Sequence, residues 1–553
     1  MMVYVRSRIS SWIGKYSFPE ILSIILLVIQ LVLPWTGRFF LTQDGPSHLY
    51  NALATKALLL HPEGPFGKSY EFQHQVTTNW SMTALFSLFA FIFSPSHAEQ
   101  AMATACILFG FAAISYFIRS LDCTTSGVSP VVNFLLNTWF LWMGFYNFYI
   151  GIALFAYLTA YYIRNLARLD WRRTIVLSAG ALITFFTHVL PYALLIISVI
   201  LISAWMHVVV PITFAEPRRS ISATLRSAVR LWAVPLVALL PSLLLFGVYL
   251  QGALTGTTLV SNYEWAFNAF PMHLFASARG KVGEQAFLVP VILFYCAIGV
   301  LSMKKRQWTT ARGAVSIMAF VSFLLYLFIP DAGFGGSLIK IRMLWPMFIC
   351  GAAIASSLPG LRRIQTPLGI YITCYMVFTL SQAGKQNVYD VSRVAEACKP
   401  IFDLIPPGAN VVRLGYPTEL TRTFFNMDAI AVDPILHIEA WGAAQGGWVD
   451  LSDYQALTHI FPLREHRSLS NFRYPLWGLE GVTASGAPGL REILNSFPLK
   501  IHYILVIGDG RAEDRSEILK ELRSRMHLVA TDSSNAFIWL FKNSESRQTT
   551  DPK

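Results

Sequence analysis

The residues best suited to chemistry follow the first long apolar run, in the segment FFLTQDGPSHLYN over residues 39–51. Asp44 comes where the chain reaches the depth of a lipid head group, and carboxylates are common general acids and bases. The alternative role is structural, because Asp is a preferred N-cap and Pro46 suits the first turn of a helix. The two roles are compatible, since a capping carboxylate can still face a cavity.

The same segment predicts an interfacial amphipathic helix over residues 46–60. Its apolar face would consist of Leu49, Leu53, Ala57 and Leu60. His48 follows Asp44 by four residues, a spacing that puts both on one face of a helix. We therefore expect His48 to lie close to the carboxylate.

His188 precedes Pro191 at the end of another apolar run. A polar residue at membrane depth usually faces a cavity or a polar partner. The alternative is a hydrogen bond to backbone carbonyls that the proline frees. His48, His74 and His188 with Asp44 would be a ligand set for a divalent metal, but no spacing such as HExxH supports one. We expect no cofactor, with a divalent metal as the less favoured alternative.

Two aromatic segments lie farther along the chain. The loop 251–285 is rich in aromatic residues and contains Glu264, a second candidate acid. An interfacial belt explains such aromatics, and a wall for a lipid tail or a sugar is the functional alternative. The stretch DPILHIE over 433–439, followed by Ala-Trp-Gly, is polar and aromatic. It either covers an active site or grips an acceptor, or it serves only the fold of its domain.

The composition requires a lipid environment around most of the first 380 residues. Of the 553 residues, 54% are hydrophobic and only 13% are charged, against about 25% charged in soluble domains. This excludes a soluble enzyme, a disordered chain and a disulfide-stapled secreted domain. The net charge of +12 sits mostly in short loops beside apolar runs, where the positive-inside rule accounts for it. We therefore expect no nucleic-acid binding.

Basic clusters assign the sides of the membrane. Five of them are placed on the cytoplasmic side: residues 6–15, 164–173, 218–230, 304–312 and 362–363. This leaves the loops 39–78, 251–285 and 331–338 outside. An odd number of crossings must then precede Arg164, so we expect three, with a broken or re-entrant passage near Gly144–Asn147. The count is about eleven spans, with twelve or thirteen as alternatives, and the first apolar run is a retained span rather than a cleavable signal.

Charge density returns to ordinary values after Gln382. Residues 384–553 are predicted to form an extracytoplasmic α/β domain, after a transmembrane module over 1–383. Strands are expected at Asn410–Leu414, Tyr503–Gly508, His527–Ala530 and Phe537–Phe541, and a helix at Arg515–Met526. The fold class is thus an α-helical polytopic membrane protein with a C-terminal α/β domain.

This layout resembles the GT-C superfamily of membrane glycosyltransferases, which includes the protein O-mannosyltransferases and the aminoarabinose transferases. The resemblance rests on Asp44 in DGPSH, on Asn79-Trp80 opening the next apolar run, and on KIRMLWP over 340–346. The last is similar to the Arg-Phe-Leu-Pro element at the outside end of a late span in such proteins. Here Met-Leu-Trp separates the arginine from the proline.

The resemblance implies inverting transfer of a sugar from a polyprenyl-phosphate donor to an acceptor hydroxyl on the outer face. Asp44 would remove the acceptor's proton. Arg342 and Lys340 would bind the donor phosphate, with interfacial snorkelling as their alternative role. His48 would orient Asp44 or contact the phosphate. Second-rank cations are Arg279 and Lys281.

The resemblance also places the protein in a bacterial plasma membrane, and the basic cluster over residues 6–15 puts the N-terminus on the cytoplasmic side. The acceptor is a glycan, a lipid or a protein. Two other classes stay open: a transporter or lipid flippase, and a non-catalytic scaffold. A transporter would be expected to carry ionisable sites near mid-membrane and repeated halves.

Overall fold

The computed structural model describes most of the chain, in segments with gaps between them. The described residues are 17–122, 129–213, 221–254, 288–333, 336, 338–415, 433–458, 460–466, 469, 490, 491, 494, 495, 497–508, 512–532 and 538–543. The chain divides into two compact units. Unit 1 comprises residues 1–34, 103–141 and 145–384, and unit 2 comprises 35–102, 142–144 and 385–553.

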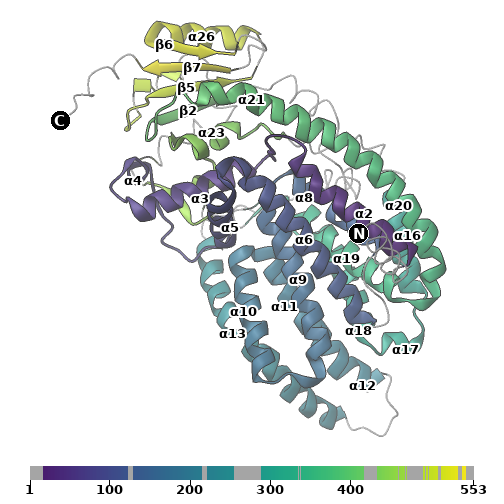
Figure 1. Cartoon of the computed structure of the whole chain (residues 1–553). Helices are drawn as coiled ribbons and strands as arrows, with labels where there is room; N and C mark the ends of the chain where they lie inside the picture. Colours follow the sequence, from purple (N-terminus) through teal and green to yellow (C-terminus); the bar gives the residue numbers. More distant parts are fainter. Residues whose placement is uncertain are drawn as a thin grey trace, which may run out of the picture. The chain divides into compact units, whose positions relative to one another are not determined.

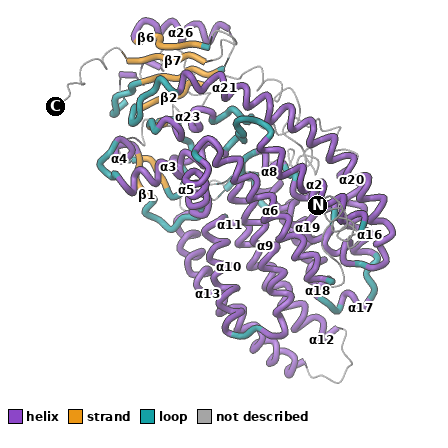
Figure 2. Tube along the Cα trace, in the orientation of Figure 1, coloured by secondary structure: helices purple, strands orange, loops and turns teal. Residues whose placement is uncertain are grey.

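Unit 1 is helical (Figures 1 and 2). Its helices are α2 (Phe18–Val32), most of α6 (Pro95–Leu121), α7 (Pro130–Leu136), α8 (Trp139–Trp142, which ends in unit 2), α9 (Tyr146–Asn165), α10 (Trp171–Thr187), α11 (Val189–Ala204), α12 (Val210–Thr213), α13 (Ile221–Leu254), α16 (Leu288–Leu301), α17 (Lys305–Trp308), α18 (Ala311–Phe328), α19 (Ile339–Ser357) and α20 (Arg362–Ala383). A π-helical stretch, Trp205–Val209, links α11 to α12.

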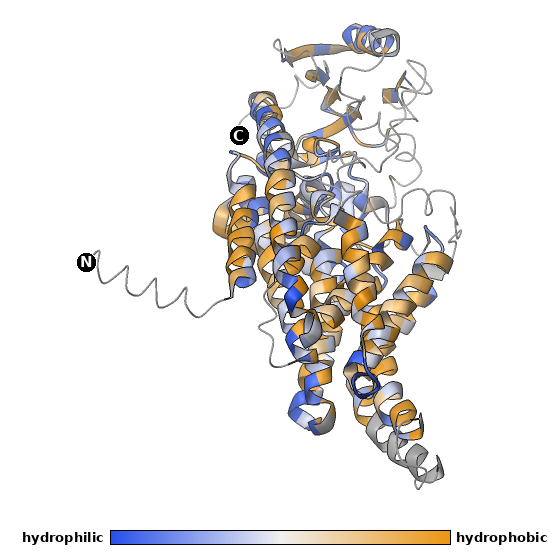
Figure 3. Cartoon of the chain, turned by 90° about the vertical axis from the view of Figure 1, so that its right-hand side faces the viewer, coloured by the Kyte–Doolittle hydropathy of each residue, from blue (hydrophilic) through white to orange (hydrophobic). Residues whose placement is uncertain are grey.

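Among the described residues, six helices are long and apolar enough to cross a membrane. They are Phe18–Trp35, Pro95–Leu121, Val189–Thr213, Ala233–Gly252, Ala311–Phe328 and Ile339–Ser357, with Trp80–Phe93 and Val289–Leu301 as shorter apolar helices. Figure 3 shows hydrophobic residues along these helices. The chain is therefore a multi-pass membrane protein, and the count of about eleven spans stays a prediction.

Close helix packing gives unit 1 its core. Helix α19 packs against α16 and α18. Of the residues in its most apolar stretch, 89% are buried. Small residues bring α16 and α19 together: a Cβ added at Gly351 would lie 2.8 Å from Cys296 Cβ, and one at Gly299 would lie 2.7 Å from Ala355 Cβ. Small residues let membrane helices approach in this way.

A buried polar network joins α2 to α7. Asn133 Nδ2 donates to Ser23 Oγ at 2.7 Å, and Asn133 Oδ1 accepts from Gln30 Nε2 at 3.0 Å. Without water in the bilayer core, such side chains satisfy one another. The helices then break where the sequence predicted an interruption: α8 ends at Trp142, α9 begins at Tyr146, and Gly144 between them has φ +76°.

Unit 2 combines the first long loop with the C-terminal part of the chain. Its helices are α3 (Gly45–Leu60), α4 (Pro65–Ser69), α5 (Trp80–Phe93), the start of α6, α21 (Val391–Phe402), α23 (Ile438–Gly446) and α26 (Ala512–Arg525). Its strands are β1 (Tyr70–Phe72), β2 (Asn410–Gly415), β3 (Val449–Asp450), β4 (Leu463–Glu465), β5 (Tyr503–Ile507), β6 (Met526–Thr531) and β7 (Ile538–Asn543). Helix α3 is the helix predicted for residues 46–60.

The main sheet of unit 2 has the order β3-β2-β5-β7-β6. Strand β2 pairs parallel with β3 and β5, and β7 pairs antiparallel with β5 and β6, so the sheet is mixed. All four strands and the helix predicted for the C-terminal domain are present. A separate two-stranded sheet pairs β1 with β4, with Tyr70 opposite Glu465. It fastens the first long loop to the C-terminal part of unit 2.

Candidate functional site

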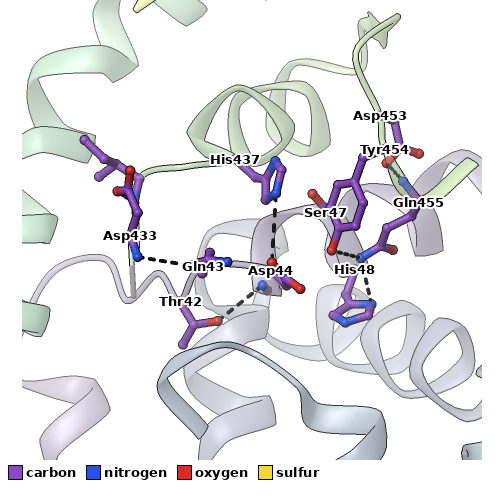
Figure 4. Close-up of polar contacts among 12 residues, drawn as sticks. Thr42, Gln43, Asp44, Ser47, His48, Asp433, His437, Asp453, Tyr454 and Gln455 are labelled. Atoms are coloured by element: carbon purple, nitrogen blue, oxygen red, sulfur yellow. Dashed lines mark hydrogen bonds and ion pairs between the residues drawn. The ribbon is translucent and has the colours of Figure 1, made fainter. Parts of the chain in front are cut away.

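Hydrogen bonds fix the segment that carries Asp44, and Figure 4 shows the polar residues around it. The Asp44 amide donates to the Met143 carbonyl at 3.0 Å. Thr42 Oγ1 contacts Glu99 Oε1 at 2.5 Å and accepts from the Gly45 amide at 3.2 Å. Asp44 occupies the N-cap position of α3, but its side chain makes no capping hydrogen bond. The carboxylate is therefore not engaged in the capping that residue type alone would favour.

The Asp44 carboxylate faces two residues from the C-terminal part of unit 2. His437 Nε2 lies 3.9 Å from Asp44 Oδ1, and both side chains are 13% exposed. The Tyr454 hydroxyl hydrogen-bonds to Asp44. The rings of His437 and Tyr454 stack, with centroids 4.6 Å apart and planes at 21°. We call Asp44, His437, Tyr454 and Glu439 the Asp44 cluster.

Tyr454 acts as a hydrogen-bond donor throughout the neutral pH range. Burial, followed by the charge of Asp44, raises the pKa of its phenol well above the usual range. The phenol therefore keeps its proton and stabilises the ionised form of the Asp44 carboxylate. An ionised carboxylate is the form that can accept a proton.

Within the Asp44 cluster, Glu439 lies beside His437, and Arg413 lies beside Glu439. Glu439 Oε1 lies 3.7 Å from His437 Nδ1. Its other oxygen, Oε2, lies 3.3 Å from Arg413 Nε, and the Glu439 side chain is 2% exposed. Glu439 lies in the first turn of α23, where the helix dipole also favours a negative charge. The guanidinium compensates this buried charge, as a buried carboxylate requires.

His48 lies in the same unit in an apolar setting. Its ring stacks on Phe86 with centroids 6.4 Å apart and lies tilted against Phe461 at 5.6 Å. Its Nδ1 lies 3.2 Å from Gln455 Nε2. Burial, followed by the charge of His437, lowers the pKa of His48 from 6.5 to about 3. The ring is therefore neutral at ordinary pH, and the phosphate contact considered for His48 stays a prediction. Gln455 also donates to the Tyr454 hydroxyl at 3.2 Å, so His48 reaches the Asp44 cluster only through intermediates.

A second group of polar residues lies in unit 1 around Arg342. The Arg342 guanidinium carbon lies 4.6 Å from the ring centroid of Phe145 and 5.2 Å from that of Phe148. Its Nη1 lies 2.9 Å from His188 Nε2. Arg342 is only 9% exposed, so it does not snorkel to solvent. We call Arg342, His188, Phe145 and Phe148 the Arg342 cluster.

Both ring nitrogens of His188 face hydrogen-bond donors. His188 Nδ1 already accepts from the Leu190 amide at 3.1 Å, while Arg342 approaches Nε2. A neutral imidazole has one acceptor nitrogen, and a guanidinium has only donors. The Leu190 amide and the Arg342 guanidinium therefore approach the same imidazole ring from its two nitrogens.

Lys340 is fully buried, and its Nζ donates to the Leu327 carbonyl at 3.1 Å. The Asp331 carboxylate accepts from the backbone of Lys340, and the charges of Lys340 and Arg342 favour its ionised form, although burial raises its pKa overall. The loop before α19 therefore supplies one carboxylate near two cations. The snorkelling role considered for Lys340 and Arg342 does not match their burial.

The remaining sequence candidates are placed as follows. His74 is 61% exposed and lies 3.9 Å from Glu71. Asn79, with φ 65°, precedes α5 and donates to the Ile460 carbonyl at 2.9 Å. Trp80 begins α5 and is 37% exposed. Three candidates lie outside the described residues: Glu264, Arg279 and Lys281.

Metal ligation was the alternative for the histidines. Among the residues that the structure describes, no group of three or more His, Cys, Asp or Glu side chains is arranged to hold a metal ion. His188 lies with Arg342 in unit 1, whereas Asp44, His48 and His74 belong to unit 2. His437, Glu439 and Tyr454 were not expected as partners of Asp44, although the polar segment 433–439 carried a signal in the sequence.

Comparisons with known proteins place the fold. No protein-family model matches the sequence, and no curated protein matches it. Among solved structures, the Archaeoglobus fulgidus oligosaccharyltransferase AglB, in complex with an inhibitory peptide and a dolichol-phosphate, matches with a TM-score of 0.50 and 11% identity, over 98% of this chain and 75% of that one. The chain is therefore structurally similar to this GT-C glycosyltransferase across most of its length.

Two further matches have lower TM-scores. The arabinofuranosyltransferase AftD from Mycobacteria matches 95% of this chain at 13% identity with a TM-score of 0.48. ArnT from Cupriavidus metallidurans matches 97% of this chain and 98% of that one at 10% identity, with a TM-score of 0.47. This chain spans 39% of the length of AftD.

Proposed function

We propose that this protein is an integral-membrane glycosyltransferase that moves a sugar from a polyprenyl-phosphate donor to an acceptor hydroxyl on the extracytoplasmic face. Transfer inverts the anomeric centre, and Asp44 takes the proton of the acceptor. The fold shared with GT-C enzymes supports the class. The observation that carries the proposal is that Asp44 stands at a helix start without capping it and instead faces Tyr454 and His437.

The chemistry asks for a carboxylate that is ionised and held still. The Tyr454 phenol, which keeps its proton, favours the ionised form of Asp44. The amide of Asp44 is tied to Met143, so its backbone is fixed. An acceptor hydroxyl within about 2.6–3.2 Å of the carboxylate would lose its proton to it as the bond to the sugar forms. General-base catalysis of this kind contributes about 10²–10⁴-fold to the rate.

For the donor phosphate we propose Arg342, with His188 beside it and Lys340 as a second cation. The burial of Arg342 beside His188 supports this role, because a guanidinium offers a phosphate several charge-assisted hydrogen bonds. Arg342 is held by two aromatic rings, which keeps its donor fork in one orientation. As the bond between sugar and phosphate breaks, the leaving phosphate gains charge that this guanidinium would stabilise.

The topology expected from the sequence belongs to the same proposal. The N-terminus is cytoplasmic, about eleven spans cross a bacterial plasma membrane, and a module over 1–383 precedes an extracytoplasmic domain over 384–553. The AglB structure of the same fold contains dolichol-phosphate, which supports a lipid-phosphate donor here. The acceptor class, whether glycan, lipid or protein, is an outcome of the assay.

The test is sugar transfer by the purified protein in lipid nanodiscs. Radiolabelled polyprenyl-phosphate sugars are supplied singly, with cell-envelope glycan, lipid and protein fractions as acceptors. Wild type should form product, and Asp44→Asn should lose at least about 10²-fold in kcat with an unchanged melting temperature. Asp403→Asn is the matched control, because Asp403 is an exposed carboxylate paired only locally with Lys399. Equal product from wild type and Asp44→Asn would remove Asp44 as the base, and a scaffold would yield no product.

A further inference from the structure

His437 lies between two carboxylates that come from different parts of unit 2. Its Nε2 faces Asp44 Oδ1 at 3.9 Å, and its Nδ1 faces Glu439 Oε1 at 3.7 Å. The two contacts use the two nitrogens of one ring, so the imidazole connects the carboxylates in a row. The ring is 13% exposed, which leaves it partly in contact with water.

The surroundings of His437 select one tautomer of the neutral ring. Glu439 is the more buried carboxylate, at 2% exposed, and Arg413 holds it in place. An ionised carboxylate accepts a hydrogen bond and cannot donate one. The Nδ1 atom therefore carries the proton toward Glu439, and the lone pair of Nε2 points toward Asp44. Glu439 thus orients the His437 ring, as the outer carboxylate does in His–carboxylate pairs.

We propose that His437 is a proton relay that resets Asp44 during each turnover. This inference rests on the proposed function, because it gives the proton from the acceptor hydroxyl a path away from the base. His437 does not touch the substrate in this scheme and acts only through Asp44. Glu439 is the positioning residue that sets its tautomer.

The steps balance as follows. The acceptor O–H bond breaks, its proton moves to Asp44, and the acceptor oxygen bonds to the anomeric carbon. The bond from that carbon to the phosphate oxygen breaks, and the phosphate keeps the electron pair. The proton on Asp44 then moves to His437 Nε2, which forms an imidazolium between two carboxylates. Loss of the Nε2 proton to water restores the starting state.

The distance between Asp44 and His437 allows proton transfer through one bridging water. At 3.9 Å, the Asp44–His437 pair is longer than a direct hydrogen bond, so one bridging water or a small approach completes the path. The charged and titratable groups facing the ring, among the described residues, are Asp44, Glu439 and Tyr454 across its face, with the neutral ring of His48 nearby. Arg413 adds its charge behind Glu439.

The experiment measures transfer as a function of pH for wild type, His437→Gln and Glu439→Gln. Wild-type kcat should fall toward acid pH, since a ring that already carries a proton on both nitrogens cannot accept another. His437→Gln should lower kcat by about 10–100-fold, lose this acid limb, and leave the KM for the donor unchanged. Glu439→Gln should lower kcat as well, and the double variant should be no slower than His437→Gln alone.

Chemical rescue separates a relay from a packing role. Added imidazole should restore part of the kcat of His437→Ala, because it can occupy the vacated space and accept the proton. His527→Gln is the matched control, since His527 lies exposed on β6. A His437→Gln enzyme with wild-type kcat and acid limb would overturn the relay. Loss of activity with an unchanged acid limb and no imidazole rescue would overturn it too.

The same data distinguish failure of the relay from failure of the proposed function. If Asp44→Asn is inactive while His437→Gln behaves as wild type, only the relay is wrong. If Asp44→Asn transfers as fast as wild type, the proposed base fails and the relay fails with it. No product from wild type across the whole donor panel would overturn both.

Discussion

Asn51 Nδ2 donates a hydrogen bond of 2.9 Å to Asp453 Oδ2, a residue 402 positions later in the chain. Both side chains are buried, so loss of this hydrogen bond would leave buried polar groups unsatisfied and destabilise the folded protein. It joins α3, which begins directly after Asp44, to the turn that supplies Tyr454 and Gln455. Asp453 also accepts from the Gln455 amide at 3.2 Å. The position of Tyr454 relative to Asp44 is thus set by buried polar contacts on both sides.

Substitution of Gly144 by Ala should damage both stability and activity. Gly144 has φ +76°, and an added Cβ would lie 2.6 Å from the Gly45 amide nitrogen and in contact with Thr42 Oγ1. The left-handed conformation alone costs a side chain about 1–3 kcal/mol. Relief of the contacts would move the segment that carries Asp44, so kcat should fall together with the melting temperature.

The matched control for this variant is Gly247→Ala. A Cβ at Gly247 meets nothing within 4 Å, and the residue lies inside α13. Melting temperature in detergent and transfer in nanodiscs should both stay at or slightly above wild type. A Gly144→Ala protein as stable and active as Gly247→Ala would show that the backbone there is adjustable.

Arg342→Lys should weaken donor binding although it keeps the charge. A lysine loses the planar donor fork and the stacking on Phe145 and Phe148. A hydrogen bond to a charged group contributes about 1.5–3 kcal/mol, so the donor KM should rise by about 10-fold or more, and Arg342→Gln should raise it further. Arg306→Gln, at an exposed arginine of α17, serves as the control. An unchanged KM in Arg342→Gln would exclude this arginine from phosphate binding.

His48 should make the protein sensitive to acid. Burial lowers its pKa from 6.5 to about 3 in the folded state, so between these values the unfolded chain binds a proton that the folded protein does not. Stability therefore falls as pH drops below about 6.5 and is unaffected by this group above it. From pH 6.5 to 4.5 the loss is on the order of 2–3 kcal/mol.

The measurement is the unfolding free energy at pH 7.5 and 4.5 for wild type and His48→Gln. Other acid-sensitive groups are common to both proteins, so the difference between the two pH-dependent losses isolates His48. The variant should lose less stability on acidification. Equal losses would mean that His48 takes up a proton in the folded protein as easily as in the unfolded chain.

Local sequence patterns predicted the elements that local forces determine. Helix α3 follows from the Asp-Gly-Pro start and the apolar spacing after it, and β2, β5, β6 and β7 follow from short alternating or apolar runs. The interruption before α9 was visible in the aromatic, Asn-containing stretch around Asn147. The span count is harder to read, because polar residues in a helix such as α9 lower its hydropathy although Asn147, Thr159 and Tyr162 are buried inside the protein.

Contacts between distant segments had no local signal. The pairing of β1 with β4 joins Tyr70 to Glu465, and nothing in the three residues of β1 identifies that partner. His437 stood in a segment whose polarity was evident, but its approach to Asp44 depends on how α23 packs against α3. His48 shows the opposite case: its spacing from Asp44 suggested a shared task, whereas its ring is enclosed by Phe86 and Phe461.

The 402-residue separation of Asn51 and Asp453 has a consequence for biosynthesis. A ribosome adding about 5–20 residues per second needs roughly 20–80 s to make the chain between them. Throughout that interval the first long loop has emerged without the partners that later bury it. A nascent chain arrested before Asp453 would expose α3 to proteases and chaperones, so the maturation of the whole protein waits for its last third.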